Sequence, residues 1–234
     1  MQHSECRRDY IQAEGSGCDC LIGGACEGRG EAPAPFSVIT ADPNWFETGG
    51  GKRGAQEHYP IMKTPDIIEL LLDPVRCEPL TRVDPVRSAL FLWVTNNFLR
   101  DGLEVLDALG YRYVTNLVWA KDRPGLGYYF SGQHELCLFA VKGKWARLPK
   151  VPGINSTLLG NGTIPHPKDE HGKRIHSRKP EELASMIEQR FDGPFLELFA
   201  RQPRPGWEVW GNESDGSRVL GGEALQSSEN NGER

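Results

Sequence analysis

The sequence has no long run of apolar residues. No segment approaches the ~20 consecutive apolar residues of a membrane-spanning helix, so we expect no contact with the membrane interior. Residues 1–8 are polar or charged and no apolar core follows them, so we also expect no secretory signal. With 38% hydrophobic and 25% charged residues among 234, the composition indicates a globular protein large enough to bury a core. We therefore expect a cytoplasmic location.

The sequence also has no excess of basic residues. Lys and Arg number 27 against 32 Asp and Glu, a net charge of −5, which excludes a protein that coats nucleic acid with its whole surface. A local basic groove stays open, because affinity for phosphates depends on where the charges lie. Solvated charge runs are the alternative interpretation. The candidates for phosphate contacts are Lys52, Arg53, Lys142, Lys144, Arg147, Lys150, Lys168, Lys173, Arg174, Arg178 and Lys179.

Cysteine is sparse, and without an export signal the six cysteines are expected to be thiols. Cys77 and Cys137 lie in predicted elements, where they are expected to be small core residues. A zinc site near the N-terminus is one interpretation, but the spacing there is not the usual pair separated by two residues. A loosely ordered arm is the other. The cysteines concerned are Cys6, Cys18, Cys20 and Cys26.

Three regions are expected along the chain: a flexible Cys- and Gly-rich arm (1–34), one domain (35–213) and a disordered polar tail (214–234). Within the domain, strands and helices alternate, which indicates an α/β fold with a mostly parallel sheet. Ligands of such sheets bind outside the carboxyl ends of the strands. The predicted strands cover residues 36–42, 89–94, 113–119, 135–141 and 195–200, and a short piece at 207–210 follows the last of them.

Helices are predicted from the spacing of apolar residues and from capping residues. Thr64 is expected as the N-cap of the first helix, with Pro65 as its first residue. A second helix is predicted over 97–109 and a third from about 181 to 190. The apolar faces of the first two are expected to be Ile67, Ile68, Leu71 and Leu72, and Phe98, Leu99, Leu103, Leu106 and Leu109.

The most informative segment is 42–45, Asp-Pro-Asn-Trp, directly after the first predicted strand. The Asp42 carboxylate and the Pro43 carbonyl are two acceptors at a strand end, and Trp45 offers a flat ring for stacking. Such a set suits the exocyclic amino group of a base. The alternative is a simple strand-terminating turn, because Asp-Pro and Pro-Asn are common turn dipeptides.

Several blocks together resemble the family of adenine-N6 methyltransferases that includes the catalytic subunit of messenger-RNA N6-adenosine methyltransferase and bacterial and phage DNA-methylating relatives. They match in order and cover about residues 36–213. The blocks are 41–45, 54–55 with 58–62, 90–95, 119–121, 132–136, 176–180, 196–201 and 211–213. The Gly-rich segments after residue 46 and around 123–127 resemble the bacterial and phage branch more.

The resemblance implies a Rossmann-like fold with helices on both faces of the sheet, and S-adenosylmethionine as methyl donor. It also implies roles for single residues. His58 and His134 lack a third ligand at suitable spacing, so no metal is expected. The implied catalytic residues are Asp42, Pro43, Asn44 and Trp45; the implied cofactor contacts are Asp42, Tyr59, Lys179, Phe199, Arg201, Asn212 and Glu213; the implied substrate contacts are Tyr59, Lys121, Glu135 and Lys179. The simpler alternatives are a surface lysine at 179, a solvated glutamate at 135 and strand-end capping at 212–213.

The function implied is methylation of adenine N6 in DNA. Two alternatives stay open: RNA as the substrate, and a catalytically silent nucleic-acid-binding partner subunit on the same fold. The second is suggested by Asn44, which stands where the family usually has a second proline, and by the acidic net charge. The oligomeric state cannot be predicted.

Overall fold

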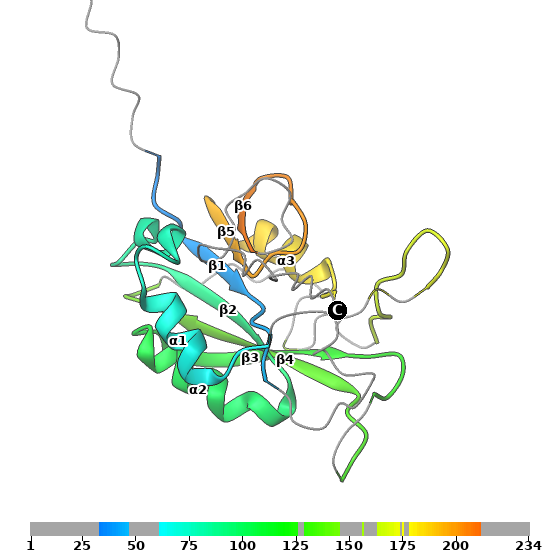
Figure 1. Ribbon diagram of the computed structural model, residues 1–234. Coiled ribbons are helices and arrows are strands. Elements are labelled where there is room, and N and C mark those ends of the chain that lie inside the picture. The colour runs from blue at the N-terminus through cyan, green and yellow to red at the C-terminus, as the bar shows by residue number, and fades with distance from the viewer. Residues whose placement is uncertain are drawn as a thin grey trace, which may run out of the picture. The chain divides into compact units, whose positions relative to one another are not determined.

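The computed structural model describes residues 33–46, 61–125, 129–145, 156, 163–173, 175 and 178–211 (Figure 1). The expected N-terminal arm with its four cysteines, and the expected C-terminal tail, lie outside these residues. The chain divides into two units, 1–33 and 34–234, and the described elements belong to the second. Within the described ranges, every helix is too short or too polar to span a bilayer.

A six-stranded sheet forms the centre of the fold, in the order β3-β4-β2-β1-β5-β6 (Figure 1). Strands β2, β1, β5 and β6 pair in parallel, whereas β4 runs antiparallel to both β2 and β3. The prediction of a mostly parallel sheet is therefore confirmed. The strands span β1 (Val38–Ala41), β2 (Ala89–Val94), β3 (Arg112–Ala120), β4 (His134–Val141), β5 (Phe195–Leu198) and β6 (Trp207–Trp210).

The continuous apolar runs of β1 and β2 explain their central places. Every residue of both strands is buried, as expected of strands covered on both faces. β1 ends at Ala41 because the chain turns out of the sheet at Pro43, which has no N–H to donate. The antiparallel direction of β4 was not anticipated. It arises because a hairpin loop, rather than a crossover helix, joins β3 to β4.

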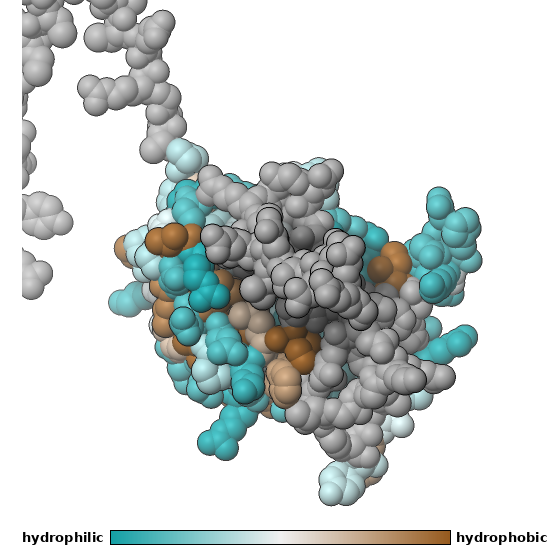
Figure 2. Space-filling view, viewed as in Figure 1, coloured by the Kyte–Doolittle hydropathy of each residue, from teal (hydrophilic) through white to brown (hydrophobic). Residues whose placement is uncertain are grey.

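Helices cover both faces of the sheet, as expected (Figure 1). α1 (Thr64–Leu72) and α2 (Leu99–Ala108) pack on the face that carries Ile39. α3 (Glu182–Arg190) packs on the opposite face, against Val38. Two 3₁₀ helices complete the described elements: η3 (Glu78–Arg82) and η4 (Asn96–Phe98). In Figure 2, polar side chains cover most of the described surface in view, and apolar ones appear only in small groups.

The buried stripes of α1 and α2 differ in part from the predicted faces. In α1, Leu70 is buried and Leu72 is 55% exposed, because 67, 70 and 71 form one stripe at helical spacing and 72 lies a further 100° around the helix. In α2, Val105 is buried and Leu99, in the first turn, is 38% exposed. The predicted inward positions of Leu72 and Leu99 are wrong.

The predicted N-cap role of Thr64 is also wrong. The structure has Lys63 at the N-cap, and no side chain bonds the free amides of the first turn. The Thr64 hydroxyl instead donates to Oδ1 of Asp101 at 2.5 Å, across to α2. Thr64 is buried, so its hydroxyl needs an internal acceptor. The residue therefore ties two helices together.

Cys77 and Cys137 are fully buried thiols, which confirms that they are core residues. Burial raises the pKa of the Cys77 thiol to about 12, and it raises the pKa of Cys137 as well. Both thiols therefore stay protonated and inert at neutral pH.

Candidate active site

The segment after β1 is fixed by backbone hydrogen bonds. The Asp42 amide donates to the carbonyl of Leu198 at 3.4 Å, and the Trp45 amide donates to the carbonyl of Pro43 at 3.0 Å. The chain on either side of Trp45 pairs with Met62, through hydrogen bonds of 2.8 and 2.9 Å. Asp42 thus projects from a rigid turn at the carboxyl edge of the parallel strands, as predicted.

Trp45 does not present an open ring. Its side chain is 7% exposed, its indole N–H donates to the carbonyl of Trp93 at 3.0 Å, and its ring stacks on Phe98 at 5.5 Å. The expectation that Trp45 is a free platform for a base is wrong for this structure. A large ring next to a buried strand gains more from the core than from the surface. Trp45 here holds the turn in place.

An ion network surrounds the Asp42 carboxylate. Nζ of Lys179 lies 2.8 Å from Oδ1 of Asp42 and 3.3 Å from Oε2 of Glu135. Nζ of Lys121 bonds the other oxygen of Glu135. All four side chains are at most 20% exposed. The alternatives of a surface lysine at 179 and a solvated glutamate at 135 are therefore wrong.

The network arises from distant parts of the chain. Asp42 follows β1, Lys121 follows β3, Glu135 lies near the start of β4, and Lys179 precedes α3. The antiparallel direction of β4 brings its first residues to the same edge as the last residues of β2, since Leu136 pairs with Val94. Without that direction, Glu135 would lie at the far edge of the sheet.

The charges in this network shift two pKa values. Burial alone would raise the pKa of Glu135, but the charges of Lys179 and Lys121 outweigh it and lower that pKa from 4.5 to about 2. Burial alone would lower the pKa of Lys179, but the carboxylates of Asp42 and Glu135 outweigh it and raise that pKa. Glu135 and Lys179 therefore remain charged at neutral pH.

This shift predicts a pH-dependent stability. A carboxyl whose pKa is lowered by folding stabilises the protein above its ordinary pKa, and that contribution is lost as the pH falls from about 4.5 to 2. We expect Glu135→Gln to cost about 3 kcal/mol at pH 7, with the difference from wild type shrinking below about pH 4.5. Urea unfolding, followed by tryptophan fluorescence between pH 2.5 and 7, measures both.

Glu104→Gln, on the exposed face of α2, is the matched control, and we expect it to change stability by less than about 0.5 kcal/mol at every pH. A Glu135→Gln deficit that does not vary with pH would contradict the assignment.

Two tryptophans form the wall behind the lysines. Nζ of Lys179 lies 5.6 Å from the ring centre of Trp93, and Nζ of Lys121 lies 4.9 Å from that of Trp119. The two rings meet edge to face at 6.3 Å. Each ring attracts its lysine and limits access of water to the network.

Arg201 connects the turn after β1 to the segment after β5. One of its terminal nitrogens donates to Oδ1 of Asn44 at 3.2 Å and lies 4.0 Å from Oδ2 of Asp42. A proline at position 44 has no side-chain acceptor, so this hydrogen bond depends on the residue that departs from the family pattern. Asn44 therefore adds a contact to the site that the usual motif lacks.

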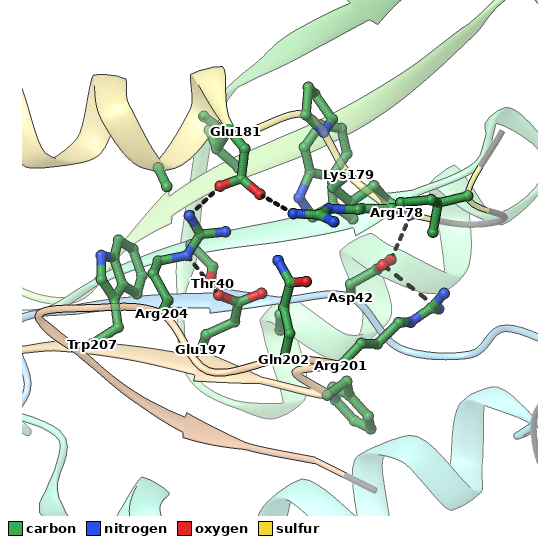
Figure 3. Close-up of a pocket in the computed structure, with 17 residues that line it drawn as sticks. Thr40, Asp42, Arg178, Lys179, Glu181, Glu197, Arg201, Gln202, Arg204 and Trp207 are labelled. Carbon is green, nitrogen blue, oxygen red and sulfur yellow. Dashed lines mark hydrogen bonds and ion pairs between the residues drawn. The ribbon is translucent and has the colours of Figure 1, made fainter. Parts of the chain in front are cut away.

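A cavity of about 200 Å³ opens beside Asp42, at the carboxyl ends of β1 and β5 (Figure 3). Four residues predicted to contact the cofactor line it: Asp42, Lys179, Phe199 and Arg201. Figure 3 shows Asp42 between Lys179 and Arg201 at one end. The other predicted cofactor contacts, Tyr59, Asn212 and Glu213, lie outside the described residues.

Sequence reasoning missed a second set of charged residues in this cavity. Nε of Arg204 donates to Oε2 of Glu197 at 3.0 Å, and its guanidinium also bonds Glu181 (Figure 3). Burial raises the pKa of Glu197, although Arg204 opposes the effect. The signal was available: Glu197 interrupts the otherwise apolar run 195–200. A carboxylate inside a buried strand needs either a partner or a function.

The backbone at the end of β5 is unusual. Phe199 has φ of +60°, a left-handed conformation that non-glycine residues adopt rarely. The next amide, of Ala200, donates to the carbonyl of Trp210 at 3.0 Å. Gly211 lies so close that a Cβ on it would be 2.2 Å from the Ala200 oxygen. Glycine at 211 therefore lets β6 close against the turn that presents Arg201.

Two of the lysines expected to contact phosphates lie far from Asp42. Lys142 and Lys144 follow β4, whose end pairs with the start of β2, so they lie at the edge of the sheet opposite Asp42. The eight residues of β4 span roughly 25 Å. Nζ of Lys142 lies over the ring of Tyr111 at 4.5 Å. These two lysines are wrong as candidates for phosphate contacts, because the direction of β4 was not foreseen.

The remaining predictions concern the other candidates for phosphate contacts and the metal ligands. Lys168 and Lys173 are exposed, and Lys52, Arg53, Arg147, Lys150 and Arg174 lie outside the described residues. His58 is also outside them, and no three His, Cys, Asp or Glu side chains of the described part gather as metal ligands.

The comparisons with known proteins bear on these residues. The family model MT-A70 matches residues 36–213, from the segment before β1 to just beyond β6. The chain belongs to the MT-A70 family. Its sheet, with helices on both faces, is the S-adenosylmethionine-dependent methyltransferase fold of that family.

Individual MT-A70 relatives come from several kingdoms. The N(6)-adenosine-methyltransferase MT-A70-like protein of Arabidopsis thaliana is 28% identical over 79% of this chain and 24% of its own length. The N(6)-adenosine-methyltransferase catalytic subunit METTL3 of Homo sapiens is 32% identical over 79% of this chain and 29% of its own. The Type II methyltransferase M.MunI of a Mycoplasma species is 26% identical over 79% of this chain and 80% of its own. The chain thus spans about a quarter of the plant and animal relatives. The expected bacterial or phage origin stays a prediction.

The cavity has suitable chemistry for the methyl donor of this family, S-adenosylmethionine. That molecule carries an ammonium, a carboxylate and ribose hydroxyls. The cavity offers carboxylates at Asp42 and Glu197 and cations at Lys179 and Arg201. Its volume of about 200 Å³ is below the ~300–1,000 Å³ of complete ligand pockets, so the described residues enclose only part of the donor.

Proposed function

We propose that this chain transfers a methyl group from S-adenosylmethionine to the N6 amino group of adenine in DNA. The observation that carries the proposal is the position of the Asp42 carboxylate, which faces the donor-type cavity and is held at 2.8 Å by Lys179. A carboxylate and a neighbouring carbonyl at that edge are the acceptors that an aromatic amino group requires.

The residues of the chain are suited to make a poor nucleophile reactive. The lone pair of an adenine amino group is delocalised into the ring. Hydrogen bonds from that group to Asp42 and to the second lone pair of the Pro43 carbonyl favour a tetrahedral nitrogen with its lone pair directed outward. When bound, S-adenosylmethionine supplies a sulfonium-borne methyl carbon, which is electrophilic without a metal, and its sulfur keeps the electron pair of the broken bond. The nitrogen is cationic after the transfer and then releases one proton to solvent.

Lys179 and Glu135 act through Asp42 in this proposal. Lys179 fixes the direction of the carboxylate, and Glu135 fixes Lys179 from the other side. Because all three side chains are largely excluded from water and already paired, little reorganisation is needed when a base enters. A base in a duplex would first have to leave the stack.

DNA is preferred over RNA as the substrate because the match to the Type II methyltransferase M.MunI extends over 80% of that protein. RNA is the second candidate, favoured by the 32% identity to METTL3.

The test compares methyl transfer by wild type and Asp42→Asn. We expect wild type to label DNA from tritiated S-adenosylmethionine, with N6-methyladenine as the product after digestion, and the variant to be about 100-fold slower or worse. Asp66→Asn, an exposed aspartate of α1, is the control and should match wild type.

Duplex DNA, single-stranded DNA and RNA are tested in parallel. Transfer to RNA alone would select the second candidate. Binding of the donor without transfer to any of the three would reject the enzyme and favour a silent partner subunit.

A further inference from the structure

The hairpin that carries Lys121 and Glu135 continues beyond strands β3 and β4. The Lys121 amide donates to the carbonyl of Gln133 at 2.8 Å, and the Gly125 amide donates to the carbonyl of Gly132 at 2.8 Å. The side-chain amide of Gln133 also donates a 3.2 Å hydrogen bond to the Lys121 carbonyl, so two hydrogen bonds join these residues. These bonds fix the direction in which the loop leaves the sheet.

Two adjacent aromatic residues lie in this loop, fully in solvent. Tyr129 is 96% exposed and Phe130 is 89% exposed, the highest values among the large hydrophobic residues that the structure describes. Tyr113, on the outer face of β3, is only 40% exposed. Two uncovered rings gain nothing for the fold, because neither removes apolar surface from water.

The two rings lie near the proposed site. Phe130 is five residues from Glu135, so their Cα atoms are at most roughly 18 Å apart. Glu135 in turn contacts Lys179, which contacts Asp42. A span of this size corresponds to about five stacked base steps at ~3.4 Å each. The rings can therefore reach bases close to a target held at Asp42.

The charges at the root of the loop favour a nucleic acid over a protein as the occupant. Asp122 pairs with His166 at 3.3 Å, whereas the exposed Arg123 has no acidic partner among the described residues. The loop thus combines flat rings with an uncompensated cation, which suits base faces and phosphates.

We propose that Tyr129 and Phe130 stack on bases that flank the target adenine. The proposal rests on the proposed function, because it assumes a nucleic-acid substrate at Asp42. The loop would thus offer stacking surfaces to the flanking bases, whereas the ring of Trp45 is buried in the core.

The test is an abasic scan of an oligonucleotide that wild type binds and that holds a single adenine as the target. Single abasic sites are placed at each position within five of the target, and the Kd is measured by fluorescence anisotropy. We expect wild type to lose about tenfold in affinity at one or two positions. The double variant Tyr129→Ala/Phe130→Ala should bind the intact oligonucleotide about tenfold or more weakly and lose nothing further at those positions. Its kcat at saturating oligonucleotide and its affinity for S-adenosylmethionine should match wild type within twofold.

The control is Tyr113→Ala, which removes an exposed tyrosine from the other end of the same hairpin and should leave oligonucleotide affinity unchanged. Methylation with no change of affinity in the double variant would overturn the stacking proposal and leave the proposed function standing. The abasic pattern without methyl transfer would support the stacking proposal and overturn the proposed function. Wild type that binds no oligonucleotide would reject both. A change of sedimentation in the double variant, with unchanged oligonucleotide affinity, would identify a protein contact instead and also overturn the proposal.

Discussion

Replacing Lys179 by methionine is expected to lower kcat/KM for methyl transfer by about 100-fold or more. Lys179 is the cation between the carboxylates of Asp42 and Glu135, at 2.8 and 3.3 Å. Without it, the two carboxylates lie in a poorly solvated site with less compensation, so the pKa of Glu135 rises and Asp42 loses its fixed direction. Removing one member of a buried ion pair costs about 3–5 kcal/mol, so the midpoint of urea unfolding should fall as well.

Two further variants and a check of folding serve as controls for this prediction. Lys144→Met removes an exposed lysine at the opposite edge of the sheet, and it should change neither rate nor stability. Lys179→Arg keeps the charge and should retain more stability than methionine. Steady-state rates are compared at a temperature where urea titration shows each variant to be folded. Wild-type rates in folded Lys179→Met would remove Lys179 from the proposed mechanism.

Gly211→Ala is expected to have the largest effect on stability. A methyl group there would lie 2.2 Å from the carbonyl oxygen of Ala200 and 2.5 Å from its nitrogen, both backbone atoms that cannot rotate away. The end of β6 would have to separate from the turn at Phe199, which already has a strained φ of +60°. We expect a loss of about 4 kcal/mol or more, measured by urea unfolding, and weaker binding of S-adenosylmethionine, measured by calorimetry.

Gly206→Ala is the matched control, because it alters the glycine directly before β6, whereas Gly211 directly follows that strand. Gly206 has φ of +79° with no atom within 4 Å of an added Cβ, so alanine there costs only the left-handed conformation, about 1 kcal/mol. Equal losses of stability in the two variants would mean that the close approach of Gly211 to Ala200 does not cause the destabilisation of Gly211→Ala.

Much of the fold follows from local sequence patterns. The apolar run 89–94 predicted β2 with its observed ends, because a continuous apolar run of this length suits a strand buried on both faces and is too short for a buried helix. The buried stripes of the helices were less predictable. Leu72 and Leu99 are apolar, but only the packing of each helix on the sheet decides which leucines face inward.

The part of the site that lies at the end of β1 was predicted from the sequence. The part that depends on the direction of β4 was not. The rule that ligands bind at carboxyl edges placed Asp42 correctly beside a cavity. The antiparallel course of β4 brought Glu135 to that edge and took Lys142 away from it. A signal for that direction was available, because the Gly-rich segment 121–133 between β3 and β4 has no helical pattern and favours a hairpin over a crossover helix. The burial of Trp45, by contrast, depends on Phe98 and Trp93, which only the tertiary structure brings near.

The place of β1 has a consequence for synthesis on the ribosome. β1 is the first of the strands that the structure describes, and it pairs with β2 on one side and with β5, the last but one of these strands, on the other. Until residue 198 has emerged, one side of β1 therefore offers unpaired amides and carbonyls to any passing chain. The nascent protein should accordingly depend on chaperones until its last two strands arrive.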